Sequence, residues 1–164
     1  MSDRPIVLLR EDHARIATIL DRLLAETGAK VVFLANRNGE QIAAAGNLSG
    51  MDPASLGSLA AGNVAATRGL ARLIGEQEFS VLFHEGTRDH LHISLVCEDA
   101  ILLIQFDART TLGLVRLRVR RVSPELEPVL EEIRARSVAL EGALLRSTGA
   151  LAGITDDEID ALLA

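Results

Sequence analysis

The sequence predicts an α+β fold, a five-stranded antiparallel sheet flanked by helices in the order α-β-β-α-β-β-β-α. Three observations predict this order. Three long segments carry apolar residues every three or four positions, the spacing of helices that are buried on one side. Five short segments are rich in apolar and β-branched residues, and tight turns between neighbours favour antiparallel pairing. With 164 residues the chain is long enough to bury one core.

The first three predicted elements are a helix and a β-hairpin. Residues 12–27 have apolar side chains at helical spacing, and Gly28 follows where glycine commonly ends a helix. Residues 30–36 are a short β-branched run, and "QIAAAG" returns as the second strand. The dipeptide Asn38-Gly39 between them predicts a type I′ turn.

A second helix and a three-stranded meander follow. Asp52 is a suitable N-cap and Pro53 a suitable first residue, so we expect a helix from there to about Ile74, closed by Gly75. Three strand candidates come next, at residues 79–85, 90–97 and 100–106. The last of these candidates contains "ILLIQF", which has apolar residues on both faces of a strand. We therefore expect residues 100–106 to form a central strand that is covered on both sides.

The segment after the meander admits two interpretations. "VRLRVRRV" alternates like a strand, whereas over a longer window apolar residues recur at helical spacing from Leu112 to Ile133. Pro124 and Pro128 oppose a helix, but the longer pattern favours one. We expect one domain over residues 8–136, a flexible spacer over 137–153, and a separate segment over 154–164.

The C-terminal segment "ITDDEIDALLA" is acidic and amphipathic. Thr155 and Glu158 form a capping box, and the apolar strip consists of Ile154, Ile159, Leu162 and Leu163. Eleven residues are too few for a stable isolated helix. The segment is therefore either a motif that folds on a partner or a helix that docks on its own domain, and the sequence favours neither.

The second helix has two unlike sides. Its leucine side should cover the sheet and consists of Leu56, Leu59, Ala66, Leu70, Leu73 and Ile74. A second stripe, the small-residue surface, has little side-chain volume and consists of Ser58, Gly62, Ala65, Gly69 and Arg72. Glycine inside a helix costs about 0.5–1 kcal/mol relative to alanine. The stripe either packs closely on the protein's own sheet or lets another molecule approach, and the leucine side favours the second interpretation.

Nothing in the sequence predicts an active site or a bound cofactor. No phosphate-binding loop, nucleophile elbow or zinc-ligand motif is present. His84, His90 and His92 on neighbouring strands could suggest a metal site, but a polar strand face explains them better. The cluster Arg109, Arg116, Arg118, Arg120 and Arg121 could meet an acidic partner or a phosphate; a solvated face balanced by nearby acids is favoured.

Composition excludes other classes of function. A net charge of −6 disfavours binding to a phosphate backbone, and the absence of Trp and Tyr disfavours single-stranded nucleic acid. A single cysteine, Cys97, allows no internal disulfide, and no signal peptide or membrane-spanning run is recognisable. We therefore expect a cytoplasmic protein without membrane insertion.

Several segments together resemble a known family. They are "AKVVFLANRNG", "SLGSLAAGNVAATRGLARLIGE", "FHEG", "FDARTTLGLVRLR" and the tail "ITDDEID". Over about residues 8–136 and the tail, the chain resembles the roadblock/dynein light chain family, and within it the MglB-like regulators of polarity and motility. The resemblance implies a roadblock/profilin-like fold and a homodimer in which two sheets join into one of ten strands.

The resemblance also implies a partner and a function. The partner is an MglA-like Ras-family small GTPase bound by two protomers, whose switch regions are remodelled to stimulate GTP hydrolysis without a donated arginine. It assigns Gly62, Asn63, Ala65, Ala66 and Gly69 to the surface for the sister helix and the GTPase. Arg68 or Arg72 could be an arginine that is donated in trans to the GTPase, although the family pattern argues against this role.

The tail residues implied to dock on the GTPase and to aid nucleotide exchange are Ile154, Asp156, Asp157, Ile159 and Leu162. A cell pole is one place where such a protein would concentrate. The alternative function is a roadblock-type scaffold that recruits a GTPase or polarity complex without stimulating hydrolysis. In either case we expect a regulator rather than an enzyme.

Overall fold

The structure is a computed structural model that describes residues 6–97 and 100–152. Its contacts divide the chain into two units: the larger spans Leu8–Leu130, and the smaller contains Val7 and the chain from Glu131 onward. In chain order the elements are α1 (Arg10–Thr27), β1 (Val31–Asn36), β2 (Gln41–Gly46), α2 (Pro53–Leu73), β3 (Val81–Glu85), β4 (Asp89–Val96), β5 (Ala100–Asp107) and α3 (Leu112–Ala152). This order confirms the predicted fold class.

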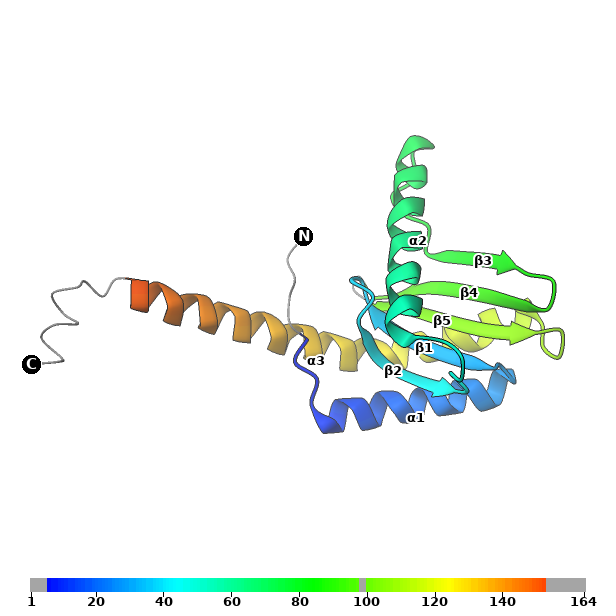
Figure 1. The fold of residues 1–164 in the computed structure, drawn as a ribbon, viewed down its shortest axis with the longest axis horizontal. Coiled ribbons are helices and arrows are strands. Elements are labelled where there is room, and N and C mark those ends of the chain that lie inside the picture. The colour runs from blue at the N-terminus through cyan, green and yellow to red at the C-terminus, as the bar shows by residue number, and fades with distance from the viewer. Residues whose placement is uncertain (1–5, 98–99, 153–164) are drawn as a thin grey trace, which may run out of the picture. The chain divides into compact units, whose positions relative to one another are not determined.

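The larger unit is built on a five-stranded sheet in the order β2-β1-β5-β4-β3 (Figure 1). Every neighbouring pair is antiparallel. The middle strands β1 and β5 are buried along almost their whole length, which confirms the prediction of a central, fully covered strand. The strands β2 and β3 form the two edges, and within the described residues β3 pairs with β4 alone.

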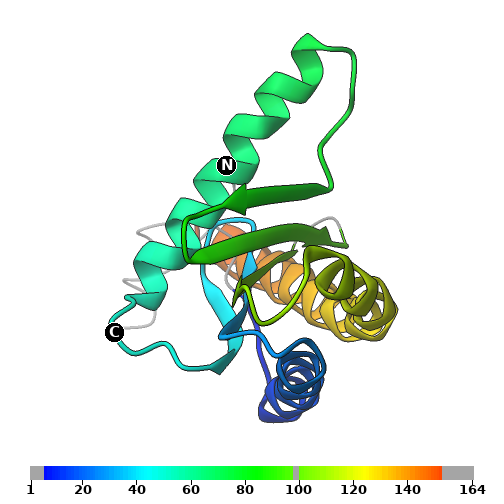
Figure 2. The same cartoon turned by 90° about the vertical axis from the view of Figure 1, so that its right-hand side faces the viewer.

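Helices cover both faces of this sheet (Figure 2). On one face Phe33, Ile101 and Leu103 pack against Ala60 and Val64 of α2. The opposite face is covered by α1 and by the part of α3 that belongs to the larger unit. Alternate strand residues point to this second face, and the largest fully buried ones there are Leu34, Leu102, Ile104 and Phe106.

The β1–β2 hairpin is where it was predicted, but its turn is not of type I′. That turn needs a positive φ at both central residues. Only Gly39 has one, at 87°. The side chain of Asn36 instead closes the loop, since its Oδ1 accepts hydrogen bonds from the backbone N–H groups of Asn38 (3.0 Å) and Glu40 (2.8 Å). A side chain just outside the dipeptide thus decides the turn type.

The predicted helix ends are confirmed. Gly28 follows α1 in the left-handed region, at φ 65°. Asp52 caps α2, and its carboxylate accepts a hydrogen bond from the backbone N–H of Ser55 at 2.9 Å. Gly75 follows the C-cap residue Ile74 with φ 83°. Local capping chemistry therefore fixes both helices at the predicted places.

The third helix is confirmed and is longer than expected. Pro124 and Pro128 lie inside it without ending it. It continues to Ala152, so residues 137–152 are helical where a flexible spacer was predicted. An interior glycine such as Gly142 costs a helix about 1 kcal/mol and does not by itself end it. The predicted tail residues Ile154, Asp156, Asp157, Ile159 and Leu162 lie outside the described residues.

Candidate functional site

The orientation of α2 differs from the prediction. Its buried residues are Gly57, Ala60, Val64 and Ala71. On the predicted leucine side only Leu56 packs against the core. Leu59, Leu70 and Leu73 are 75%, 56% and 82% exposed, so the prediction that these leucines cover the sheet is wrong.

A backbone contact explains this orientation. A Cβ on Gly57 would lie 1.9 Å from the carbonyl oxygen of Gly39, so the first turns of α2 lie too close to the hairpin turn to leave room for a side chain at this position. Only small residues fit on the side of the helix that continues from this contact. Gly57 was not predicted from the sequence as a contact residue, although its position three and seven residues before Ala60 and Val64 marks the same stripe.

The small-residue surface points away from the core. All five of its residues are exposed, as is Ala66, while Asn63 is half-buried. A Cβ added to Gly62 or Gly69 would meet no atom within 4 Å. The protein's own packing therefore does not require these two glycines, and the alternative that the stripe packs on its own sheet does not hold.

The C-terminal part of α2 extends past the edge strand β3 (Figure 1). The exposed Leu70, Leu73 and Ile74 belong to this overhanging part, where the sheet beneath the helix has ended. Nearer the sheet, the Asn63 carboxamide nitrogen and His84 Nε2 of β3 are 3.1 Å apart and join helix to strand. The exposed apolar side chains of α2 therefore lie beside the unpaired edge of β3.

The two arginines considered for a role in trans differ in their surroundings. The Nε and Nη2 atoms of Arg68 donate to Glu78 Oε1 at 2.8 and 2.5 Å. Arg37 Nη1 reaches the same oxygen at 3.5 Å. These contacts hold the Arg68 guanidinium against the α2–β3 loop, whereas Arg72 is exposed on the small-residue surface.

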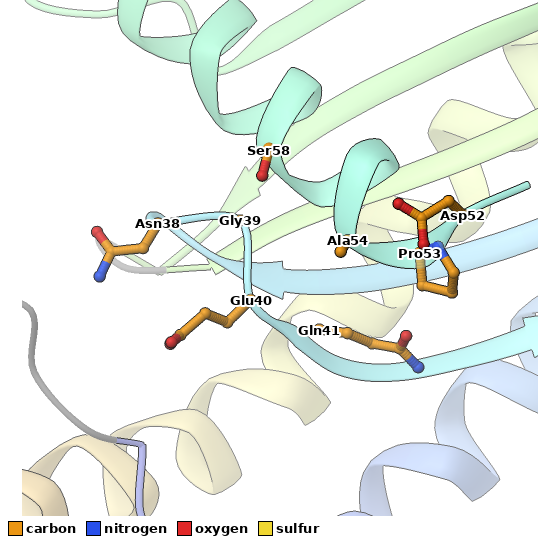
Figure 3. Close-up of a pocket in the computed structure, with 8 residues that line it drawn as sticks. All are labelled: Asn38, Gly39, Glu40, Gln41, Asp52, Pro53, Ala54 and Ser58. Atoms are coloured by element: carbon orange, nitrogen blue, oxygen red, sulfur yellow. The ribbon is translucent and has the colours of Figure 1, made fainter.

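A shallow pocket of about 440 Å³ lies where the hairpin meets the start of α2 (Figure 3). It is lined by Asn38, Gly39, Glu40, Gln41, Asp52, Pro53, Ala54 and Ser58. The Asp52 carboxylate is the N-cap of α2, and hydrogen bonds from Ser55 lower the pKa of this carboxyl group. Ser58 alone is shared with the small-residue surface, so the pocket lies at one end of that surface.

The three strand histidines do not form a site. His90 and His92 share the face covered by α1 and α3, while His84 lies on the α2 face. Within residues 6–97 and 100–152, no group of three or more His, Cys, Asp or Glu side chains could hold a metal ion. In the same part of the chain, no helix has the length and apolar character needed to span a bilayer.

The arginine cluster around the start of α3 is partly used in structural ion pairs. Arg118 pairs with Glu26 of α1 at 3.1 Å. Arg109 Nε contacts Asp107 at 3.0 Å, and its hydrogen bonds hold the pKa of the Asp107 carboxyl well below its ordinary range. Lys30 contacts Asp107 as well, and Asp89 and Asp107 together raise the pKa of its amine. The Arg118 pair joins α3 to α1, and the Lys30 pairs join the start of β1 to the adjacent ends of β4 and β5.

Comparison with known protein families matches residues 15–106 to the Roadblock/LC7 domain. The match spans more than half of the chain and includes α2 and all five strands except the last residue of β5. The chain belongs to the Roadblock/LC7 family. The surfaces of α2 described above thus lie on the shared domain of this family, while the whole of α3 lies beyond the matched residues.

Solved structures give a narrower likeness. The chain is 47% identical to Myxococcus xanthus MglB, with a TM-score of 0.73 over 78% of this chain and 96% of that one. It is 34% identical to the gliding protein MglB of Thermus thermophilus, with a TM-score of 0.72 over 80% and 99%. A structure described as MglB with tetrameric arrangement is 32% identical, with a TM-score of 0.74 over 80% and 99%. A comparison with curated protein sequences gave no match.

Proposed function

We propose that the chain is an MglB-like regulator that acts as a homodimer on an MglA-like Ras-family GTPase and stimulates GTP hydrolysis. The observation that carries the proposal is the overhang of α2 beyond β3, with exposed leucines on the helix and an unpaired strand edge below. An open strand edge invites pairing with another chain. A second copy that pairs through β3 would extend the sheet under the overhanging helix and bury its leucines.

The second surface of α2 is assigned to the GTPase. The small-residue surface lies away from the sheet, so pairing through β3 leaves it accessible. Without side-chain bulk it lets a partner's backbone approach closely and gain many dispersion contacts. Asn63 and Ala66 lie beside it and belong to the same proposed contact. The similarity to MglB proteins supports this assignment.

Stimulation is proposed to work through geometry rather than through a donated charge. An arginine supplied in trans accelerates hydrolysis by about 10³–10⁵. Arg68 is held by Glu78, and this favours a structural role for it. The dimer would instead hold the switch regions of the GTPase so that the partner's own catalytic groups reach their positions. The chain would then be a regulator without an active site.

The dimer is tested by sedimentation of the purified chain. Leu70→Asp places a charge on the overhanging part of α2 and should convert the dimer to monomer. Ala14→Asp, at an exposed position of α1, is the matched control and should remain dimeric. A monomeric wild-type chain at micromolar concentration contradicts the proposed assembly.

The GTPase surface is tested with the double variant Ala65→Arg/Gly69→Arg. It should keep the fold and lose stimulation of GTP hydrolysis, because two long side chains block close approach. Ala14→Arg on α1 should keep full stimulation. If the double variant stimulates like wild type, the surface is assigned wrongly; binding without any stimulation by the wild type would identify a scaffold.

A further inference from the structure

The end of α3 presents leucines to solvent in the smaller unit. Val7 runs beside this helix: its N–H donates to Ser137 Oγ at 3.0 Å, and its carbonyl accepts from Arg136 Nη1 at 3.2 Å. Further along, Leu144 and Leu145 are 53% and 68% exposed. These two leucines are adjacent in the chain, and contiguous exposed apolar surface is typical of a site that another element covers.

The same stretch is a weak helix by itself. Between Ser137 and Ser147 it carries only two charged side chains, Glu141 and Arg146, and it contains Gly142. An isolated helix of this length is marginal in water, and most helical stability in proteins comes from packing an apolar side. A covering element for Leu144 and Leu145 would supply that packing.

The chain continues for twelve residues beyond Ala152, and those residues have the required chemistry. After Gly153, the spacing of Thr155 and Glu158 is that of a capping box and predicts the start of a new helix. Its apolar strip contains Ile159, Leu162 and Leu163. We propose that residues 154–164 fold back along the end of α3 as an antiparallel helix and cover Leu144 and Leu145.

The lengths of the two segments define the covered area. A helix rises about 1.5 Å per residue, so eleven residues span about 16 Å. Seven residues, about 10 Å, separate Ala152 from Leu145, and fourteen, about 21 Å, separate it from Val138. The tail therefore covers the two leucines but does not reach Val138, which is also exposed.

Charge and connection favour the same arrangement. In an antiparallel arrangement the N-terminus of the short helix, which carries a partial positive charge, lies beside the C-terminus of α3, which carries a partial negative charge. The exposed Arg146 then lies at the level of Asp160, so opposite charges flank the apolar contact. A connection of two or three residues also gives the tail a high effective concentration at this surface. This arrangement does not depend on the proposed GTPase, because both segments belong to the same chain.

Hydrogen exchange of the full chain tests the proposal. In the wild type, backbone amides of residues 157–163 should exchange at least about tenfold more slowly than in Leu144→Asp/Leu145→Asp. The matched control Val138→Asp should keep the wild-type protection. Equal exchange in the wild type and the double variant overturns the proposal, as does equal loss of protection in Val138→Asp.

A cross-linking experiment keeps the test independent of the double variant's folding. In a Cys97→Ser background, Leu145→Cys and Leu162→Cys should form a disulfide within one chain at least about tenfold faster than Val138→Cys and Leu162→Cys. Equal rates would contradict the antiparallel register. Cross-links found only between chains would assign the leucine surface to a second copy instead.

Discussion

Replacing His92 tests how the core on the α1/α3 face depends on pH. The side chain is 1% exposed, and neither ring nitrogen has a hydrogen-bond partner among the described residues. Burial, with a smaller contribution from the charge of Arg116, lowers the pKa of His92 from 6.5 to about 4. The imidazole is therefore neutral in the folded protein at neutral pH.

The direction of the pH effect follows from this lowered pKa. Above pH 6.5 the histidine is neutral in both states and contributes no pH dependence. Between pH 6.5 and 4 the unfolded chain takes up a proton that the folded chain does not, so stability falls as the pH falls. One pKa unit corresponds to about 1.4 kcal/mol, so the total loss is about 3 kcal/mol.

Urea denaturation from about pH 7.5 to 4 measures this loss. We expect the wild type to lose about 3 kcal/mol relative to His92→Leu across the range, at fixed protein concentration. At the upper end of the range the variant should be at least as stable, because it removes two buried nitrogens without partners. His13→Leu at an exposed position is the control. A stability difference between wild type and His92→Leu that does not change with pH would refute the reasoning.

Two further predictions concern α2. Gly57→Ala should destabilise the protein by about 1–3 kcal/mol in thermal or urea denaturation, because its Cβ meets the Gly39 carbonyl. Gly62→Ala should instead stabilise the protein by about 0.5–1 kcal/mol while weakening GTPase binding. The opposite order of stabilities would contradict the assigned surfaces. Arg68→Ala should lower the stimulated GTPase rate by much less than a thousandfold. It should also reduce thermal stability, and Glu78→Ala should reduce it at least as much, because Glu78 also contacts Arg37. A thousandfold loss of rate with intact binding would restore a donated arginine.

The sequence predicts the elements of this fold well where the signals are local. Asp52 and Pro53 place the start of α2, and Gly28 places the end of α1, because capping involves only a few neighbouring residues. The central position of β5 follows from apolar residues on both of its faces. These features depend on nothing distant in the chain.

The orientation of α2 could not be obtained in this way. It depends on contact between Gly57 and Gly39, which are far apart in the sequence, and on where the sheet ends at β3. Leucines usually mark the buried side of a helix, but Leu70 and Leu73 lie where the larger unit has no strand beneath them. The departure from the usual pattern is itself informative, because it marks the surface at which a second copy is proposed to bind.

Residue spacing alone predicts the small-residue surface, and the sequence favours its exposure because the leucines are expected to cover the sheet. The surface is indeed open around Gly62 and Gly69, but not for that reason, since most of those leucines are exposed as well. The length of α3 was missed for a different reason. Glycines and a loosely apolar pattern suggested a spacer, whereas an interior glycine costs a helix only about 1 kcal/mol and does not end it.

Single-turnover GTP hydrolysis by an MglA-like GTPase, titrated with the purified chain, tests the central claim most directly. We predict that the hydrolysis rate rises with added chain and saturates at two protomers per GTPase. Under the same conditions Ala65→Arg/Gly69→Arg should leave the basal rate unchanged. A hydrolysis rate that does not rise at wild-type concentrations where complex formation is measured would contradict the account.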